Sequence, residues 1–331
     1  MGHVKVWYRT THMTDQKPVL VSGVKPTGDL HIGNYFGAMR QQVELAQSGK
    51  YRPFIFVADY HALNSVQDAE EMRKRIREVV MAYLAIGLDP EDVVLFKQSE
   101  VSACTELCWI FDSITTMPYL MRAHAYKDAE AKNKEISVGT FNYPLLMAAD
   151  ILLYDAAVVP VGADQKQHVE YARDTAEKFN RIFKTDLFKL PEPYIVPEVA
   201  TVPGTDGRKM SKSYGNVIPL FGTRDELAKR VMGIVTDSSG DRPENVYAMH
   251  KLVRTESELA KIYDEHRGNY KMLKELLLED LDRYLAPIRA KYEELAQDSG
   301  IVEEVLARGK REARAISEAK MEQVRAAIGV A

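Results

Sequence analysis

The chain reads PVLVSGVKPTGDLHIGN from Pro18 to Asn34, where a brief apolar strand gives way to a loop with three glycines. Apolar side chains then recur at three- and four-residue steps, which predicts a helix from about Gly33 to Gln47 with one face against a sheet. Free backbone N–H groups at the start of a helix attract phosphate, and glycine lets a ligand approach the backbone closely. This order of strand, loop and helix indicates an α/β fold with a nucleotide site.

Three side chains in this stretch suit a nucleotide. His31 could donate to a phosphate oxygen, Gly33 leaves room for adenine or ribose, and Asn34 adds a neutral donor. A helix cap beside an ordinary turn would use the same residues, so this stretch alone leaves both interpretations open.

A second stretch, TVPGTDGRKMSKSYGN at 201–216, is polar and lies between turn signals, which is typical of a mobile loop. A pyrophosphate leaving group gains negative charge as it departs, and Lys209 and Lys212 on such a loop could follow that charge. Ser211 and Ser213 supply hydroxyl donors, and Met210 gives the loop an apolar anchor. A solvated basic loop is the alternative in isolation, but the occurrence of both stretches favours a triphosphate held from two sides.

The front half of the chain alternates strands and helices. Buried-strand runs at 53–59 and 93–96 flank a helix predicted from about Ala69 to Ile86, and the sheet resumes at 158–161. This alternation predicts a Rossmann-like parallel sheet over 18–222, with a helical insertion at about 100–156 and the lysine loop at 203–216. Ligands of such sheets bind beyond the C-terminal strand ends, a rule that places six residues near one crevice: Ser22–Gly23, Asp59, His61 and Gln98–Ser99.

From residue 223 to 331 the pattern is helical. Apolar positions at three- and four-residue steps mark one packed helix over about 271–295, which Pro287 is expected to kink or interrupt. The last helix has an excess of positive charge, which is either a local surface for nucleic acid or a solvated helix face. Its basic residues are Arg308, Lys310, Arg311, Arg314, Lys320 and Arg325.

Composition limits the possible classes of protein. The 331 residues are 46% hydrophobic and 28% charged, with a net charge of −4, which indicates a globular protein with room for two domains. No apolar run approaches the ~20 residues of a bilayer span, and the first residues lack a signal-peptide core, so we expect a cytoplasmic protein without membrane contact. Residues 1–17 are expected to be a flexible extension. Cys104 and Cys108 cannot form a structural zinc site alone and are expected to be reduced on a packed helix.

The two stretches, with HIGN at 31–34 and KMSKS at 209–213, resemble the two signatures of class I aminoacyl-tRNA synthetases. The segments YPLLMAADILLY at 143–154 and VVPVGADQKQH at 158–168 extend the resemblance to the bacterial tryptophanyl-tRNA synthetases, from about Pro18 to near the C-terminus. The resemblance implies ATP-dependent formation of tryptophanyl-adenylate from L-tryptophan, transfer to tRNA(Trp), and a homodimer. It also implies amino-acid contacts in the insertion and a helical anticodon-binding domain at 223–331.

The resemblance also implies the site residues. Tryptophan binding falls to Gly23, His61, Tyr143, Met147, Asp150, Val159, Val161 and Gln165. ATP binding falls to Lys25, Pro26, Thr27, Gly33, Asn34, Gly162, Ala163, Asp164, Thr201, Val202, Lys209, Met210, Ser211, Lys212 and Ser213. The catalytic residues are expected to be His31, Asn34, Lys209 and Lys212, which align and stabilise charge because the tryptophan carboxylate is already ionised. Mg²⁺ accompanies ATP and needs no protein ligand, so no metal-binding residue is expected.

The choice between tryptophan and tyrosine depends on two positions. Met147, where tyrosine enzymes typically have glutamine, suits the face of an indole, and Asp150 can accept from the ring N–H. Without the resemblance, both residues also fit an ordinary helix. Two departures from the family pattern, Lys25 in place of glutamine and Ala163 in place of an acid, are expected to tighten ATP binding.

Three alternatives stay open. A tyrosyl-tRNA synthetase-like enzyme is the nearest of them. A nucleotidylyltransferase of the same fold normally ends its signature with a Ser/Thr/Arg element, which the two lysines of this chain argue against. A non-catalytic tRNA-binding relative would keep the fold without the activity.

Overall fold

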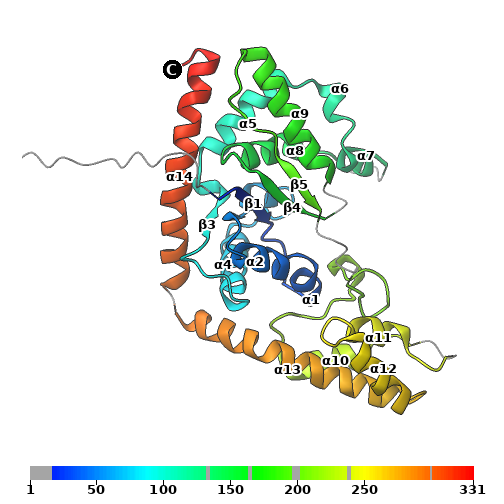
Figure 1. Cartoon of the computed structure of the whole chain (residues 1–331). Helices are drawn as coiled ribbons and strands as arrows, with labels where there is room; N and C mark the ends of the chain where they lie inside the picture. Colours follow the sequence, from blue (N-terminus) through cyan, green and yellow to red (C-terminus); the bar gives the residue numbers. More distant parts are fainter. Residues whose placement is uncertain (1–16, 132–134, 163–165, 196–201, 237–239, 299) are drawn as a thin grey trace, which may run out of the picture.

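The computed structural model describes residues 17–131, 135–162, 166–195, 202–236, 240–298 and 300–331. Its centre is a five-stranded sheet in the order β3-β2-β1-β4-β5, in which every pair of neighbouring strands is parallel (Figure 1). The strands are β1 Val19–Val24, β2 Arg52–Val57, β3 Val94–Lys97, β4 Val158–Val161 and β5 Glu192–Ile195. The predicted α/β fold with a parallel, Rossmann-like sheet is confirmed.

The central strands are buried on both faces, as their continuous apolar runs predict for a parallel sheet covered by helices. On β2, Phe54 and Phe56 join one hydrophobic cluster, whereas Ile55 and Val57 join a second. Successive side chains of a strand point to opposite faces, so the two clusters lie on the two sides of the sheet.

The helix predicted after the first loop is present as one continuous run of three segments. These are α1 Ile32–Asn34, a π-helical turn Tyr35–Met39, and α2 Arg40–Gln47. Beyond β2 come α3 Asp59–Ala62 and α4 Ala69–Ala85. A π turn inside a helix frequently lies at a functional site, and this one begins directly after the His31 turn.

Between β3 and β4 the described chain is helical, as predicted for the insertion. It contains α5 Ala103–Ile114, α6 Met117–Leu120, α7 His124–Ala131 and α8 Val138–Leu152, and α9 Lys166–Phe183 follows β4. Cys104 and Cys108 both lie on α5 as free thiols, which confirms the expectation of two reduced cysteines.

After the lysine loop come α10 Arg224–Met232, α11 Glu244–His250, α12 Glu256–Glu265, α13 Tyr270–Gln297 and α14 Ile301–Ile328. Of the kink or interruption expected at Pro287, the interruption is wrong, because α13 runs through that residue. Proline removes one helical hydrogen bond, and buried leucines on either side, Leu285 and Leu295, hold the helix in place.

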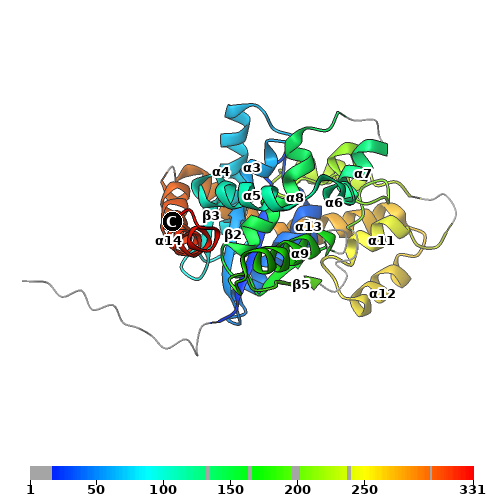
Figure 2. The same cartoon turned by 90° about the horizontal axis from the view of Figure 1, so that it is seen from above.

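The last helix returns to the sheet. Helix α14 packs along β3, the first strand in the sheet order, while α11 and α12 lie at the other end of the molecule (Figures 1 and 2). Near its start α14 adds Val305 to the cluster on one side of the sheet, and further along it adds Met321 to the cluster on the other side. Helix α14 therefore crosses the open edge of the sheet from one face to the other. The predicted boundary between two domains at 222 and 223 stays a prediction.

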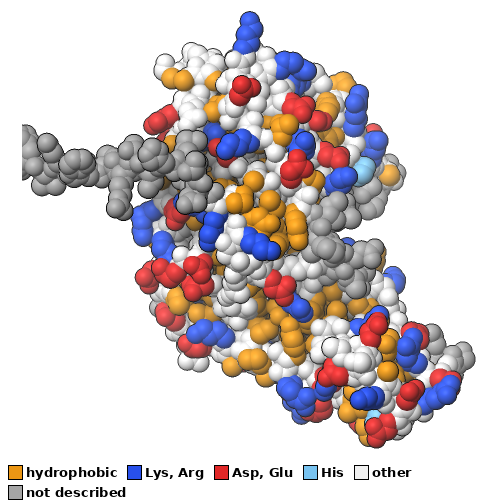
Figure 3. All heavy atoms as spheres, viewed as in Figure 1, with side chains coloured by type: hydrophobic (Ala, Val, Ile, Leu, Met, Phe, Trp, Pro, Cys, Tyr) orange, Lys and Arg blue, Asp and Glu red, His pale blue; other side chains and the backbone are white. Residues whose placement is uncertain are grey.

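The basic residues of α14 mostly face partners on the sheet-bearing part of the chain. Lys320 is 2.7 Å from Asp155, Arg325 is 2.7 Å from Glu106, and Lys310 is 3.6 Å from Glu100. Arg308 pairs with Glu91, and Arg314 donates to the carbonyl of Glu100. Figure 3 shows charges of both signs interspersed on this side of the molecule. Carboxylates of other elements thus pair with four of the six basic residues and compensate part of the positive charge, and the use of this helix stays a prediction.

None of the helices in the described ranges combines the length and the apolar character that a bilayer span requires. Of residues 1–17, only Lys17 is described, so the predicted flexible extension otherwise lies outside the described residues.

Candidate active site

The turn that carries His31 is fixed by the chain that follows the lysine loop. The backbone N–H of Ile32 donates to the carbonyl of Ile218 at 3.0 Å, and that of Leu220 donates to the carbonyl of Leu30 at 3.0 Å. The side chain of Asn34 accepts from the backbone N–H of His31 at 3.0 Å. The first stretch is thus joined to the segment directly after the second, although about 180 residues separate them.

The lysine loop has an internal frame and an apolar anchor. Met210 is buried in a cluster with Ile32 and Tyr35, as its predicted anchoring role requires. The side chain of Asn216 accepts from the backbone N–H of Ser211 at 2.8 Å and donates to the carbonyl of Lys209 at 3.1 Å. This frame fixes the backbone of the loop on both sides of Met210.

Lys212 reaches across to the first stretch. Its ammonium donates to the carbonyl of Thr27, and a Cβ on the neighbouring Gly28 would lie 2.9 Å from the Lys212 Nζ. Gly28 also has a φ of +60°, which glycine adopts at little cost. The loop cation and the glycine turn therefore meet at the place where the sequence predicts phosphate.

Burial and charge keep His31 neutral. Its side chain is mostly buried, and burial together with the positive charge of Lys212 lowers its pKa to about 4. In the described part of the chain its Nδ1 atom has no hydrogen-bond partner. Burial also lowers the pKa of Lys212, as does Arg75, while Asp29 raises it. A neutral imidazole with one donor nitrogen beside a lysine suits an anionic group.

His31 is expected to stay unprotonated until the pH falls to about 4, well below the 6.5 of a free histidine. Between those values the unfolded chain binds a proton that the folded chain excludes, so this histidine lowers the stability of the fold as pH falls through that range. NMR titration of the ring protons measures the pKa directly. Lys212→Ala should raise it by removing a repelling charge, and a wild-type pKa near 6.5 would contradict the prediction.

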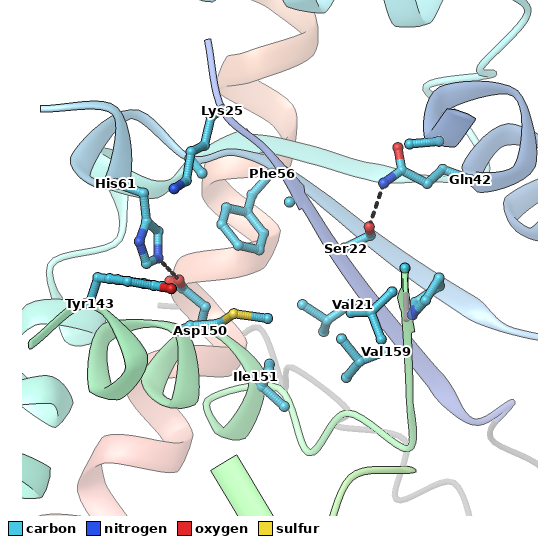
Figure 4. A pocket seen from close by; sticks show the side chains of 17 residues that line it. Val21, Ser22, Lys25, Gln42, Phe56, His61, Tyr143, Asp150, Ile151 and Val159 are labelled. Carbon is cyan, nitrogen blue, oxygen red and sulfur yellow. Dashed lines mark hydrogen bonds and ion pairs between the residues drawn. The ribbon is translucent and has the colours of Figure 1, made fainter. Parts of the chain in front are cut away.

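A cavity of about 260 Å³ lies beside the nucleotide turn, just below the usual lower range of small-molecule pockets (Figure 4). It is lined by all the described residues that the sequence assigned to tryptophan, namely Gly23, His61, Tyr143, Met147, Asp150, Val159 and Val161. Two residues assigned to ATP, Lys25 and Gly162, line it as well. The predicted amino-acid and nucleotide sites therefore share a wall.

Four of the assigned residues, Ala163, Asp164, Gln165 and Thr201, lie outside the described residues. Of the remaining nucleotide residues, Pro26 and Thr27 follow β1, and Val202 is buried beneath the lysine loop. Lys209 and Ser213 are exposed on that loop.

The polar floor of the cavity is built around Asp150, which is 3% exposed. Its carboxylate contacts His61 Nε2 at 2.9 Å, Cys104 Sγ at 2.9 Å, and Gln98 Nε2 at 2.9 and 2.8 Å. Burial raises the pKa of the Cys104 thiol, as does the nearby Asp150 carboxylate, so the thiol keeps its proton and donates. Asp150 is thus held as an acceptor on the inner wall.

Tyr143 forms another wall. Its hydroxyl pairs with Nε2 of the buried His168, and Lys25 Nζ lies 5.4 Å from the centre of its ring, within the range of a cation–π contact. Burial lowers the pKa of Lys25. Lys25, which the sequence placed beside the triphosphate, therefore points into the cavity close to His61 and Tyr143 (Figure 4).

Sequence reasoning missed several lining or supporting residues. Phe56 and Gln42 line the cavity, and the amide of Gln42 donates to Ser22 Oγ at 2.7 Å (Figure 4). Phe56 and Ile55 point to opposite faces of a buried strand, and Gln42 is a polar residue beside the apolar face of a helix, so a role in the cavity could have been suspected for both. Nothing in the sequence points to such a role for His168 or Cys104.

Comparison with known proteins places these features in a family. The profile described as tRNA synthetases class I (W and Y) matches residues 13–297. The tryptophan--tRNA ligase of Fusobacterium nucleatum is 44% identical over 318 residues, with 94% of this chain and 97% of that protein covered. The tryptophan--tRNA ligase of Campylobacter jejuni is 43% identical over 320 residues, with 94% and 99% covered.

Solved structures show the same similarity as the sequence comparison. Tryptophanyl-tRNA synthetase from Campylobacter jejuni, complexed with ADP and tryptophan, superposes with a TM-score of 0.87 at 42% identity, over 94% of this chain and 99% of that one. The enzyme from Mycoplasma pneumoniae gives a TM-score of 0.79 at 26% identity, over 96% and 99%. The joined signature stretches, the parallel sheet and this similarity over nearly the full length agree, and the chain belongs to the class I tRNA synthetases of the W and Y family.

Proposed function

We propose that this chain activates L-tryptophan with ATP to give tryptophanyl-adenylate and then transfers the aminoacyl group to tRNA(Trp). The observation that carries the proposal is the contact of Lys212 with the Thr27 turn, beside a cavity whose inner wall holds Asp150. Relatives at 44% and 43% identity are tryptophan--tRNA ligases, and one solved relative binds ADP and tryptophan.

In the first step an oxygen of the tryptophan carboxylate forms a bond to the α-phosphorus of ATP, and the bond from that phosphorus to the bridging oxygen breaks to release pyrophosphate. The carboxylate is already ionised, so no protein base is needed. The protein contributes alignment and charge stabilisation. His31, Asn34, Lys209 and Lys212 are the proposed contributors, with Lys212 following the departing pyrophosphate.

Mg²⁺ is proposed to enter as part of the MgATP substrate, bound by its phosphates. Within the described ranges, no group of three or more His, Cys, Asp or Glu side chains could hold a metal ion. Asp29, the carboxylate that raises the pKa of Lys212, pairs with Arg75. The protein's proposed part is the positive charge of Lys212, which lies at the Thr27 turn.

Tryptophan is favoured over tyrosine by the pairing of an apolar and an accepting side chain. Met147 gives a polarizable thioether for the indole face, and Asp150 gives an acceptor for the ring N–H. Tyrosine remains the closest alternative, because a carboxylate can also accept from a phenol.

The test is exchange of labelled pyrophosphate into ATP, run with tryptophan and with tyrosine in parallel. Tryptophan-dependent exchange is expected, and the tyrosine reaction should be slower by at least about two orders of magnitude. Exchange with tyrosine at the same rate would favour a tyrosine enzyme. Exchange with neither amino acid would refute aminoacyl activation.

Lys25→Gln is expected to weaken ATP binding about fivefold, since a hydrogen bond to a charged group is worth roughly 1 kcal/mol more than a neutral one. Lys25 directly follows β1 and lines the cavity beside the Thr27 turn. The measurement is the KM for ATP in pyrophosphate exchange at saturating tryptophan. An unchanged KM for ATP would contradict the prediction.

A homodimer is proposed through the insertion, which exposes large apolar side chains that a soluble surface usually hides. Trp109 on α5 is 72% exposed, Met117 on α6 is 64% exposed, and Val138 at the start of α8 is 76% exposed.

Anticodon binding is proposed for the segment from 223 onward, mainly for α10 to α13, because α14 is engaged with the sheet.

Trp109→Glu is expected to weaken dimerisation by about 10²-fold, because a charge buried in an apolar interface would have no partner. Sedimentation velocity over a concentration series measures the dissociation constant. Val235→Glu is the matched control, since Val235 is 55% exposed but lies outside the insertion. An equal effect of both substitutions, or none of either, would count against this interface.

A further inference from the structure

The acceptor positions of Asp150 are all taken. A carboxylate offers about four lone-pair sites, two on each oxygen. The Gln98 amide lies between the two oxygens, the Cys104 thiol donates to Oδ1, and His61 Nε2 bonds to Oδ2. A carboxylate oxygen can only accept, so Nε2 of His61 carries the hydrogen in this contact. An arriving ligand N–H meets an acceptor that already has its full set of donors.

The donors differ in their position relative to the cavity. His61 and Asp150 both line it, whereas Gln98 and Cys104 are not among the described residues that do (Figure 4). Gln98 is 1% exposed and Cys104 is 2% exposed, so both donate from behind the carboxylate. Only the contact between His61 and Oδ2 lies on the side from which a ligand can approach.

The imidazole ring of His61 is held by few hydrogen bonds. Its Nδ1 atom is buried and, within the described ranges, has no hydrogen-bond partner, so the ring is held by the bond from Nε2. The Gln98 side chain, by contrast, also accepts from the backbone N–H of His61 at 3.3 Å. The rings of His61 and Tyr143 are nearly perpendicular, with 6.1 Å between their centres.

We propose that His61 is exchanged for the substrate. When an indole enters, the Nε2–H of His61 leaves Asp150 Oδ2 and the ring N–H takes its place, while Gln98 and Cys104 keep the carboxylate in position. This inference rests on the proposed function, since it assumes that the cavity binds tryptophan. The number of hydrogen bonds to Asp150 is then unchanged by binding.

The exchange makes His61 a specificity-determining residue that needs no part in the chemistry. A ring without an N–H cannot replace the imidazole, so it binds with His61 still bonded to Asp150. Asp150 then has its full set of donors with either ligand, and a buried polar group without its partner is avoided in both complexes. His61 therefore lowers the selection for a ring N–H that Asp150 alone would impose.

The direct experiment uses the unaltered protein with ¹⁵N-labelled histidine, and follows the Nε2–H signal of His61 by NMR. L-Tryptophan is compared with β-(3-benzothienyl)-L-alanine, in which sulfur replaces the ring N–H. The signal of the hydrogen-bonded Nε2–H should be lost or strongly shifted with tryptophan and retained with the sulfur analogue. Retention of the signal with bound tryptophan would overturn the exchange.

Calorimetric binding of both ligands to two variants gives an independent test. His61→Phe leaves Oδ2 open, so the preference for tryptophan over the sulfur analogue should rise about tenfold, because the N–H then gains a bond without displacing one. Cys104→Ala is the matched control, since it removes a donor from the side away from the cavity and should change both affinities equally. An unchanged or smaller preference in His61→Phe would overturn the proposal.

The same titrations separate this inference from the proposed function. Absence of tryptophan binding to the wild-type protein would refute the substrate, and the exchange with it. Binding of tryptophan with the His61 bond intact would refute the exchange alone.

Discussion

Lys212→Ala is expected to lower the rate of adenylate formation by about 10²- to 10³-fold, the usual effect of removing one donor that stabilises developing charge. The ammonium lies on the carbonyl of Thr27, against the glycine turn, at the proposed position of the phosphates. It is not among the described residues that line the cavity, so the dissociation constant for tryptophan should stay within about twofold.

Single-turnover kinetics with saturating ATP measures the chemical step, and calorimetry measures tryptophan binding. Arg208→Ala is the matched control, because it removes a positive charge from the same loop. The Arg208 guanidinium pairs with Asp206 at 2.6 Å and lies 4.3 Å from the centre of the Tyr214 ring, away from the turn. Equal losses in rate and in tryptophan affinity for Lys212→Ala would contradict a role confined to the reaction.

Gly309→Ala is expected to destabilise the fold by about 3 kcal/mol or more, which is severe for one added methyl group. A Cβ at this position would lie 1.9 Å from the carbonyl oxygen of Leu95 and 2.5 Å from its carbonyl carbon. Both are backbone atoms of β3, so no side-chain rotation relieves the overlap. Helix α14 must move off the sheet edge, and the apolar contacts of Val305 and Met321 weaken with it.

Urea unfolding gives the change in stability, and hydrogen exchange at the β3 amides reports whether the edge opens. Gly37→Ala is the matched control, since nothing lies within 4 Å of a Cβ there and the helical position favours alanine by up to ~1 kcal/mol. A loss of stability in Gly309→Ala no larger than that in the control would show that α14 does not need the close approach.

The sheet and its helices could be predicted from sequence because their signals are local. Apolar runs such as 53–59 are long enough to identify a strand buried on both faces, and the helical steps after His31 continue through Gln47. The two signature stretches could be paired because phosphate chemistry restricts which residues serve. None of this required knowledge of the packing between distant segments.

The position of α14 could not be predicted for that reason. From sequence alone, Gly309 is a residue that disfavours a helix. Its role, which is to let α14 approach the backbone of Leu95 closely, is evident only from the structure. The arginines and lysines of the helix resemble a nucleic-acid surface until carboxylates from other elements are placed opposite them. The donors of Asp150 are a similar case, because Cys104 and Gln98 acquire their role only through a contact across 46 or 52 positions.

The path of α14 has a consequence for how the chain is made. Strand β3 leaves the ribosome about 200 residues before the helix that covers it, which at about 5–20 residues per second is roughly 10–40 seconds. Throughout that interval the strand has one unpaired edge, the kind of surface on which neighbouring nascent chains aggregate. Synthesis of the final helix is therefore the event that closes the sheet, so chaperone demand should be concentrated before it emerges.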